Sequence, residues 1–241
     1  MADDLFNGNL ANIVNFLAAA GGLGTAAFGL VDALKAIDGG ISNAGFRHIR
    51  LAVERLLGSH GEGGAVAFGR RDILAILRAQ WINGVDKAQQ KAVAKSLIRL
   101  GLNATDAPRL ALAAGMEADA LRLCAEHIAA GVALTPQDLN ALGRFDAVVG
   151  ALLDEGYERA DQKYRNVAKL AAALLSILLA VVGGALIYLS SEGARLGDYL
   201  VSRQLLAAML VGLISTPLAP VAKDLCTSLN AAVKAMSALR R

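Results

Sequence analysis

The sequence has few aromatic residues, few charged residues and almost no cysteine. Aromatic residues make up 5% of its 241 positions and charged residues 19%, whereas hydrophobic residues make up 55%. The two cysteines, Cys124 and Cys226, are too few and too distant for a disulfide framework, and the high hydrophobicity excludes a disordered chain. With 48 alanines and 25 glycines, the composition also argues against an all-β fold.

Catalytic and ligand-binding motifs are missing as well. There is no P-loop, dinucleotide fingerprint or catalytic triad, and Cys124 and His127 alone supply too few ligands for a metal. The glycine-rich run at 58–64 lacks the Lys-Ser/Thr pair of a phosphate-binding loop and has no preceding strand. Basic residues never run longer than two. We therefore predict that the protein is not an enzyme, uses no metal or other cofactor, and does not bind nucleic acid.

Long uncharged apolar stretches take the place of such motifs. The mean hydropathy is +0.47. Three stretches, 5–31, 170–191 and 204–222, are long enough for the roughly 20 residues that span a bilayer. Tyr164 and Tyr188 bracket the second at a helical separation of about 36 Å, which suits opposite membrane interfaces. For the first stretch, a buried helix of a soluble domain is the alternative.

The basic residues near these stretches predict one orientation. Those on one side of the membrane outnumber those on the other by eleven to two: Lys35, Arg47, Arg50, Arg159, Lys163, Arg165, Lys169, Lys223, Lys234, Arg240 and Arg241 against Arg195 and Arg203. By the positive-inside rule, the N-terminus lies outside, and residues 35–169 and the C-terminus are cytoplasmic. The expected location is the bacterial inner (cytoplasmic) membrane.

The remaining sequence has helical periodicity. Asp86 and Gly101 mark the ends of one helix, and Pro108 lies in the first turn of another. Thr135, followed by Pro136 and Asp138, starts a helix that meets no strong breaker before residue 189. If continuous, it would be about 80 Å long and would hold the cytoplasmic domain off the bilayer. Gly143 and Gly156 are possible breaks.

These patterns predict an all-α polytopic membrane protein with three transmembrane helices and a cytoplasmic helical domain. Five segments follow along the chain: an N-terminal transmembrane helix (1–34), a cytoplasmic helical domain (35–134), a long juxtamembrane helix (135–169), a transmembrane hairpin (170–222) and a cytoplasmic amphipathic C-terminal helix (223–241).

Polar and small residues within the spans are the candidate functional positions. Asn12 and Asn15 share one helix face and could line a pore or form hydrogen bonds between helices. Pro217 and Pro220 predict a kink in the third span. Small residues recur at every fourth position in all three spans. Such rows allow helices to pack closely, either within one subunit or between subunits. In a chain this rich in alanine and glycine, the rows could also arise by chance. These rows are Gly21, Thr25 and Gly29; Ala172, Ser176, Ala180 and Gly184; and Ala208, Gly212 and Thr216.

Several motifs resemble those of uncharacterised bacterial inner-membrane proteins with one N-terminal span, a helical cytoplasmic domain and a C-terminal two-span hairpin. They are GLGTAAFGLVDALK at 22–35, ISNAGFRHI at 41–49, WINGV at 81–85, AKSLIRLGL at 94–102, RFD at 144–146 and YERADQKYRN at 157–166. The third span also ends in a small-Pro-x-x-x-Asp-Leu pattern, with Val221 and Ala222 where aromatics are expected. The resemblance implies the topology and the inner membrane, and it identifies no site residues.

The favoured function is self-association in the lipid bilayer into a homo-oligomeric scaffold or pore-like assembly. A channel or transporter subunit conducting a small solute or ion along Asn12, Asn15 and the third span is the first alternative. A membrane-anchored regulatory protein or enzyme acting through residues 40–160 is the second.

Overall fold

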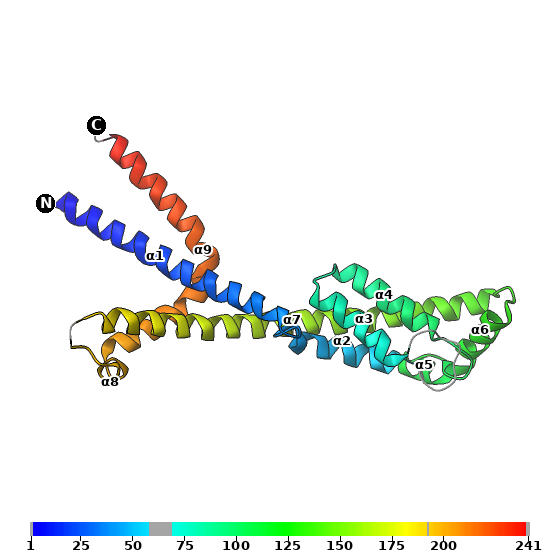
Figure 1. The fold of residues 1–241 in the computed structure, drawn as a ribbon. Coiled ribbons are helices and arrows are strands. Elements are labelled where there is room, and N and C mark those ends of the chain that lie inside the picture. Colours follow the sequence, from blue (N-terminus) through cyan, green and yellow to red (C-terminus); the bar gives the residue numbers. More distant parts are fainter. Residues whose placement is uncertain (1, 58–68, 192, 240–241) are drawn as a thin grey trace. The chain divides into compact units, whose positions relative to one another are not determined.

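The structure is a computed structural model that describes residues 2–57, 69–191 and 193–239, and every regular element in these ranges is a helix. This confirms the predicted all-helical character. Figure 1 shows the helices in chain order. They are α1 (Ala2–Ala33), the short 3-10 helix η1 (Leu34–Ala36), α2 (Ser42–Leu56), α3 (Arg70–Ile82), α4 (Lys87–Leu100), α5 (Ala107–Ala113), α6 (Ala118–Ala130), α7 (Pro136–Leu189), α8 (Leu196–Leu200) and α9 (Arg203–Leu239).

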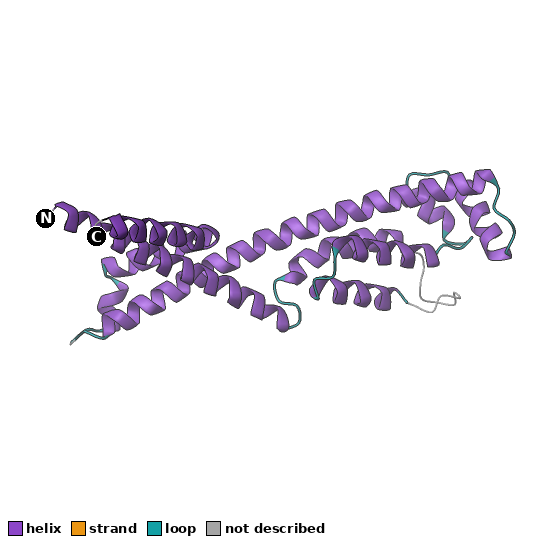
Figure 2. Ribbon diagram, turned by 90° about the horizontal axis from the view of Figure 1, so that it is seen from above, coloured by secondary structure: helices purple, strands orange, loops and turns teal. Residues whose placement is uncertain are grey.

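The chain divides into two compact units. The terminal unit contains Met1–Asp38 and Asn166–Arg241, and the middle unit contains Gly39–Arg165. Helix α7 contributes its first part to the middle unit and the remainder to the terminal unit. Short loops join many of the helices (Figure 2).

Three helices are long and apolar enough to cross a membrane. They contain Asn12–Ala36, Pro136–Leu189 and Arg203–Val221, in agreement with the three predicted spans. Within α7, the charge-free apolar stretch starts at Leu170, directly after Lys169. The part of α7 that is apolar enough to cross a membrane therefore belongs to the terminal unit.

Helix α7 is continuous over its 54 residues. Neither Gly143 nor Gly156 interrupts it, because glycine weakens a helix interior without removing a backbone donor. Helix α9 is also continuous, so the predicted third span and the predicted C-terminal helix form one element. Pro217 and Pro220 lie inside α9, and Figure 1 shows a sharp change in its direction part-way along, as predicted for two missing backbone donors.

The middle unit has its own hydrophobic core. A row on α7 provides one side of this core: Phe145, Val149, Leu153 and Tyr157 recur every four residues, and each is at most 1% exposed. Side chains of α2 to α6 pack with this row, among them Ile49, Leu56, Leu77, Ile98, Leu110 and Leu121. In α4, Leu97 is buried, but Leu100, which its spacing predicts on the same face, is exposed.

Capping residues begin and end helices of the middle unit, and Asp86 does so where the sequence predicts a helix start. The side chain of Asp86 accepts hydrogen bonds from the N–H groups of Ala88 and Gln89, at 2.9 and 3.3 Å. Gly131 closes α6 at a φ of +66°, a conformation that favours glycine.

Candidate functional surfaces

The small-residue rows of α7 and α9 face each other in the terminal unit. A Cβ atom placed on Gly212 would lie 2.5 Å from the Cα of Ile177 and 2.9 Å from the carbonyl oxygen of Ser176. A Cβ on Gly184 would lie 3.4 Å from the Cβ of Ala208. The glycines therefore allow the two backbones to approach closely, which stabilises helix pairs in lipid through van der Waals packing.

Tyr199 closes one end of this α7–α9 seam. It lies on α8, is fully buried, and donates a hydrogen bond from its hydroxyl to the carbonyl oxygen of Val181 at 3.0 Å. Its ring lies 5.6 Å from that of Tyr188, and a Cβ on Gly184 would lie 2.6 Å from its hydroxyl oxygen. The sequence predicted an aromatic residue at this end only at Tyr188. Tyr199 was missed, because a single tyrosine in a short connection between helices forms no periodic pattern.

Hydroxyl groups in the seam differ in their partners. Ser215 donates to the carbonyl oxygen of Val211 at 2.6 Å, the usual arrangement for a serine inside a spanning helix. Ser176 and Thr216 are both buried, and neither hydroxyl has a hydrogen-bond partner within the described residues. Two of the predicted site residues are thus polar groups held in tight apolar packing.

Helix α1 contacts α9 through a row that the sequence analysis missed. Ala20, Gly24, Ala27 and Val31 are buried on this face. A Cβ on Gly24 would lie 2.9 Å from the Cβ of Ala219 and would also clash with the carbonyl oxygen of Ser215. In the predicted row, Gly21 is buried, whereas Thr25 and Gly29 are exposed, and Thr25 donates back to the carbonyl oxygen of Gly21 at 2.8 Å.

The opposite side of α1 carries a second row, which we call the outer row. Its members are small or carry a side-chain amide, are all exposed, and follow alternating spacings of three and four: Asn12, Asn15, Ala19, Gly22, Ala26 and Gly29. At about 100° per residue, the row lies on the side of α1 away from the α9 contact. A Cβ on Gly22 or Gly29 would meet no atom within 4 Å. The two asparagines therefore share their face with the most open glycines of the helix.

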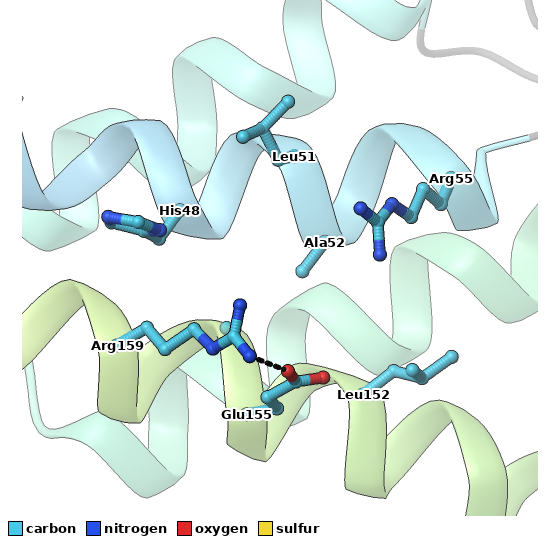
Figure 3. Close-up of a pocket in the computed structure, with 8 residues that line it drawn as sticks. His48, Leu51, Ala52, Arg55, Leu152, Glu155 and Arg159 are labelled. Carbon is cyan, nitrogen blue, oxygen red and sulfur yellow. Dashed lines mark ion pairs between the residues drawn. The ribbon is translucent and has the colours of Figure 1, made fainter.

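A groove lies between α2 and α7 in the middle unit (Figure 3). It has a volume of about 70 Å³ and is lined by His48, Leu51, Ala52 and Arg55 of α2 and by Leu152, Glu155, Gly156 and Arg159 of α7. A Cβ on Gly156 would lie 2.6 Å from the Cβ of Ala52, so the two helices are close at the floor of the groove. The sequence indicated Gly156 only as a possible helix break, because a contact with a helix about 100 positions away leaves no local pattern.

Positive charge dominates the polar lining of this groove. Arg159 and Glu155 form an ion pair at 2.7 Å along α7. Arg55 forms no hydrogen bond or ion pair with any residue in the described part of the chain. Figure 3 shows both guanidinium groups directed into the space between the helices. The groove can therefore offer guanidinium donors to an anion.

A ladder of ion pairs joins α4 to α7. Lys87 contacts Glu158 and Asp161 at 2.9 and 3.3 Å, and Lys91 contacts Asp154. Lys95 and Arg99 both contact Asp146, at 3.5 and 3.4 Å. The four basic residues recur every fourth position along α4. Hydrogen bonding to Glu158, with a further contribution from Asp161, raises the pKa of Lys87.

The start of α7 holds a buried carboxylate. Asp138 accepts hydrogen bonds from the backbone N–H and the hydroxyl of Thr135, at 2.8 and 2.7 Å, and its Oδ2 lies 2.8 Å from Nδ1 of His127. The Thr135 bonds, followed by that to His127, lower the pKa of Asp138 to about 2. Thr135, Pro136 and Asp138 thus begin the helix as predicted, whereas the contribution of His127 was not foreseen.

No group of three metal-ligating side chains occurs within the described residues. Cys124 is buried, and desolvation raises the pKa of its thiol, so it remains a protonated core residue. Comparison with protein-family models, curated proteins and solved structures finds no match to this chain.

Proposed function

We propose that the protein is an integral protein of the bacterial inner membrane that self-associates through the outer row of α1 into a homo-oligomeric scaffold or a pore-like assembly. In the proposed orientation, the N-terminus lies outside, and residues 35–169 and the C-terminus lie in the cytoplasm. The excess of basic residues around residues 35–169 and the C-terminus supports this orientation.

The composition of the outer row is the observation that supports self-association. Lipid tails offer no hydrogen bonds, so a helix face turned toward them normally carries large apolar side chains. This face instead carries two amides and a series of alanines and glycines, all exposed in the single chain. A second helix laid along the row would satisfy the amides and fill the space above Gly22 and Gly29.

A matched pair of glycines tests the proposal. Gly22→Leu adds a bulky side chain at an open position, so the subunit should remain folded while the oligomer dissociates. Gly24→Leu adds the same side chain at the α9 contact and should destabilise the subunit instead. Mass measurements in detergent, together with circular dichroism, distinguish these effects. A wild-type protein that stays at 24.9 kDa at every concentration would contradict self-association.

Cysteine cross-linking tests which face is used. In a Cys124→Ser and Cys226→Ser background, we expect disulfide dimers from single cysteines at Ala19, Gly22 or Ala26. Cysteines at Thr25 and Ala27, on the flank and on the α9 face, should cross-link much less. Equal cross-linking at all five positions would show that the outer row is not the interface.

The two asparagines favour a channel or transporter subunit as the second candidate function. Their amides are the polar groups of the outer row, and in a ring of subunits they could line a wet axis. Proteoliposomes containing the wild type should then conduct ions or small solutes, and Asn12→Leu with Asn15→Leu should abolish the flux. Absence of flux in an assembled wild-type oligomer would favour the scaffold.

A further inference from the structure

We propose that the groove between α2 and α7 binds a phosphate-type anion, with Arg55 and Arg159 as its main ligands. The two arginines come from different helices and face the same hollow (Figure 3). This site lies wholly within the middle unit, and its argument does not depend on self-association.

The shape of the groove suits a small anionic group. Its volume of about 70 Å³ exceeds that of two water molecules, at about 30 Å³ each in the liquid. The close approach of Gly156 to Ala52 narrows the floor, so an occupant lies among the side chains that line the groove, the two arginines included. Leu152 and Ala52 supply an apolar wall on which the organic part of a phosphate ester can rest.

The charges in the groove favour an anion over a cation. Two arginines and one carboxylate leave a net positive charge without any contribution from His48. Glu155 engages Arg159, whereas Arg55 has no partner in the described part of the chain, which leaves its donors available. The planar guanidinium fork matches phosphate oxygens, and such charge-assisted hydrogen bonds are stronger than neutral ones. His48 adds a ring N–H at the end of the groove.

A phosphate group can come from a soluble ester or from the headgroup of an anionic lipid. Both present the same oxygens to the two arginines, so the groove itself does not distinguish them. The two sources are separated by titrating the full-length protein in neutral detergent with inorganic phosphate and with glycerol phosphate, and in nanodiscs of phosphatidylglycerol against phosphatidylcholine.

Calorimetry on the full-length protein tests the site through three variants. Arg55→Gln and Arg159→Gln should each weaken binding of the phosphate probe about tenfold or more, because each removes charged hydrogen bonds. Glu155→Gln should strengthen binding, since it removes the carboxylate that competes for Arg159. Arg47→Gln is the matched control, because Arg47 is exposed on α2 and does not line the groove. Circular dichroism establishes that every variant is folded.

Two results would support the proposal: binding of a soluble phosphate, or a preference for phosphatidylglycerol. Either must be lost in Arg55→Gln and Arg159→Gln and kept in Arg47→Gln, and the probe that binds identifies the source of the phosphate group. No binding of any phosphate probe by the folded wild type would overturn it. Equal weakening by Arg47→Gln and Arg55→Gln would also overturn it, because the effect would then reflect the overall positive charge.

Discussion

The glycines of this chain differ in how closely other atoms surround them. A side chain at Gly212 would meet the backbone of α7, whereas one at Gly183 would meet no atom within 4 Å. The position of a glycine, and not its presence, therefore decides whether it holds two helices together.

Gly212→Ala should destabilise the α7–α9 pair by roughly 1–3 kcal/mol, the usual effect of overpacking a tight contact. Gly183→Ala should leave stability unchanged or slightly higher, because alanine favours the helix and nothing obstructs it. Unfolding in mixed SDS micelles, followed by circular dichroism, measures both. Equal stability of the two variants would mean that the seam does not depend on Gly212.

Asp138 predicts a pH dependence of folding. It lies in the middle unit, outside the apolar spanning stretch, and its folded pKa of about 2 is below the ordinary value of 3.8. A depressed pKa contributes stability that is fully present above about pH 4 and is lost as the pH falls toward 2. Asp138→Asn should therefore flatten the pH dependence of the unfolding free energy in this window. The exposed Asp119→Asn is the control and should leave the dependence unchanged.

At the scale of elements, ion pairs join the basic residues of α4, which recur at every fourth position, to acidic residues of α7. The basic residues follow a spacing visible in the sequence, but their acidic partners lie on a helix more than 40 positions away. Each pair is partly exposed, so each contributes modestly and is screened by salt.

A double-mutant cycle tests one rung of the ladder. Lys91→Ala, Asp154→Ala and the double variant should give a coupling of about 0.2–1 kcal/mol at low ionic strength. The coupling should shrink as salt shortens the Debye length from about 30 Å at 0.01 M to about 3 Å at 1 M. The same cycle on Lys91 and Asp119, which form their ion pairs with other residues, serves as the control and should give no coupling. A coupling insensitive to salt would contradict an electrostatic ladder.

At the scale of the whole molecule, the proposed orientation makes opposite predictions for two loops. In intact bacterial cells, a membrane-impermeant thiol reagent should label a cysteine at Ala194, between α7 and α8. It should label one at Ala133, between α6 and α7, only after lysis, because that loop is cytoplasmic in the proposed orientation. Both tests use the background lacking native cysteines. The reverse labelling pattern would invert the topology.

Local patterns predicted the helices well. Asp86 and Thr135 begin their helices through hydrogen bonds within a few residues, and the three apolar helices follow from runs of uncharged residues. The sequence left Gly143 and Gly156 as possible breaks in the long helix, and α7 continues through both because neither glycine removes a backbone hydrogen bond. Two prolines bend α9 without ending it, so the third apolar stretch and the C-terminal segment form one helix.

The sequence by itself determined an all-helical chain with three apolar helices, because helix periodicity, capping and hydropathy are local properties. Only the tertiary structure decided which small residues make contacts. Helix α1 has small residues on two faces. Helix α9 packs on the face that contains Gly24, whereas a Cβ on Gly22 or Gly29, on the other face, would meet no atom within 4 Å. The same holds for the α2–α7 groove, because Arg55 and Arg159 come together only when helices more than 100 positions apart pack through Ala52 and Gly156.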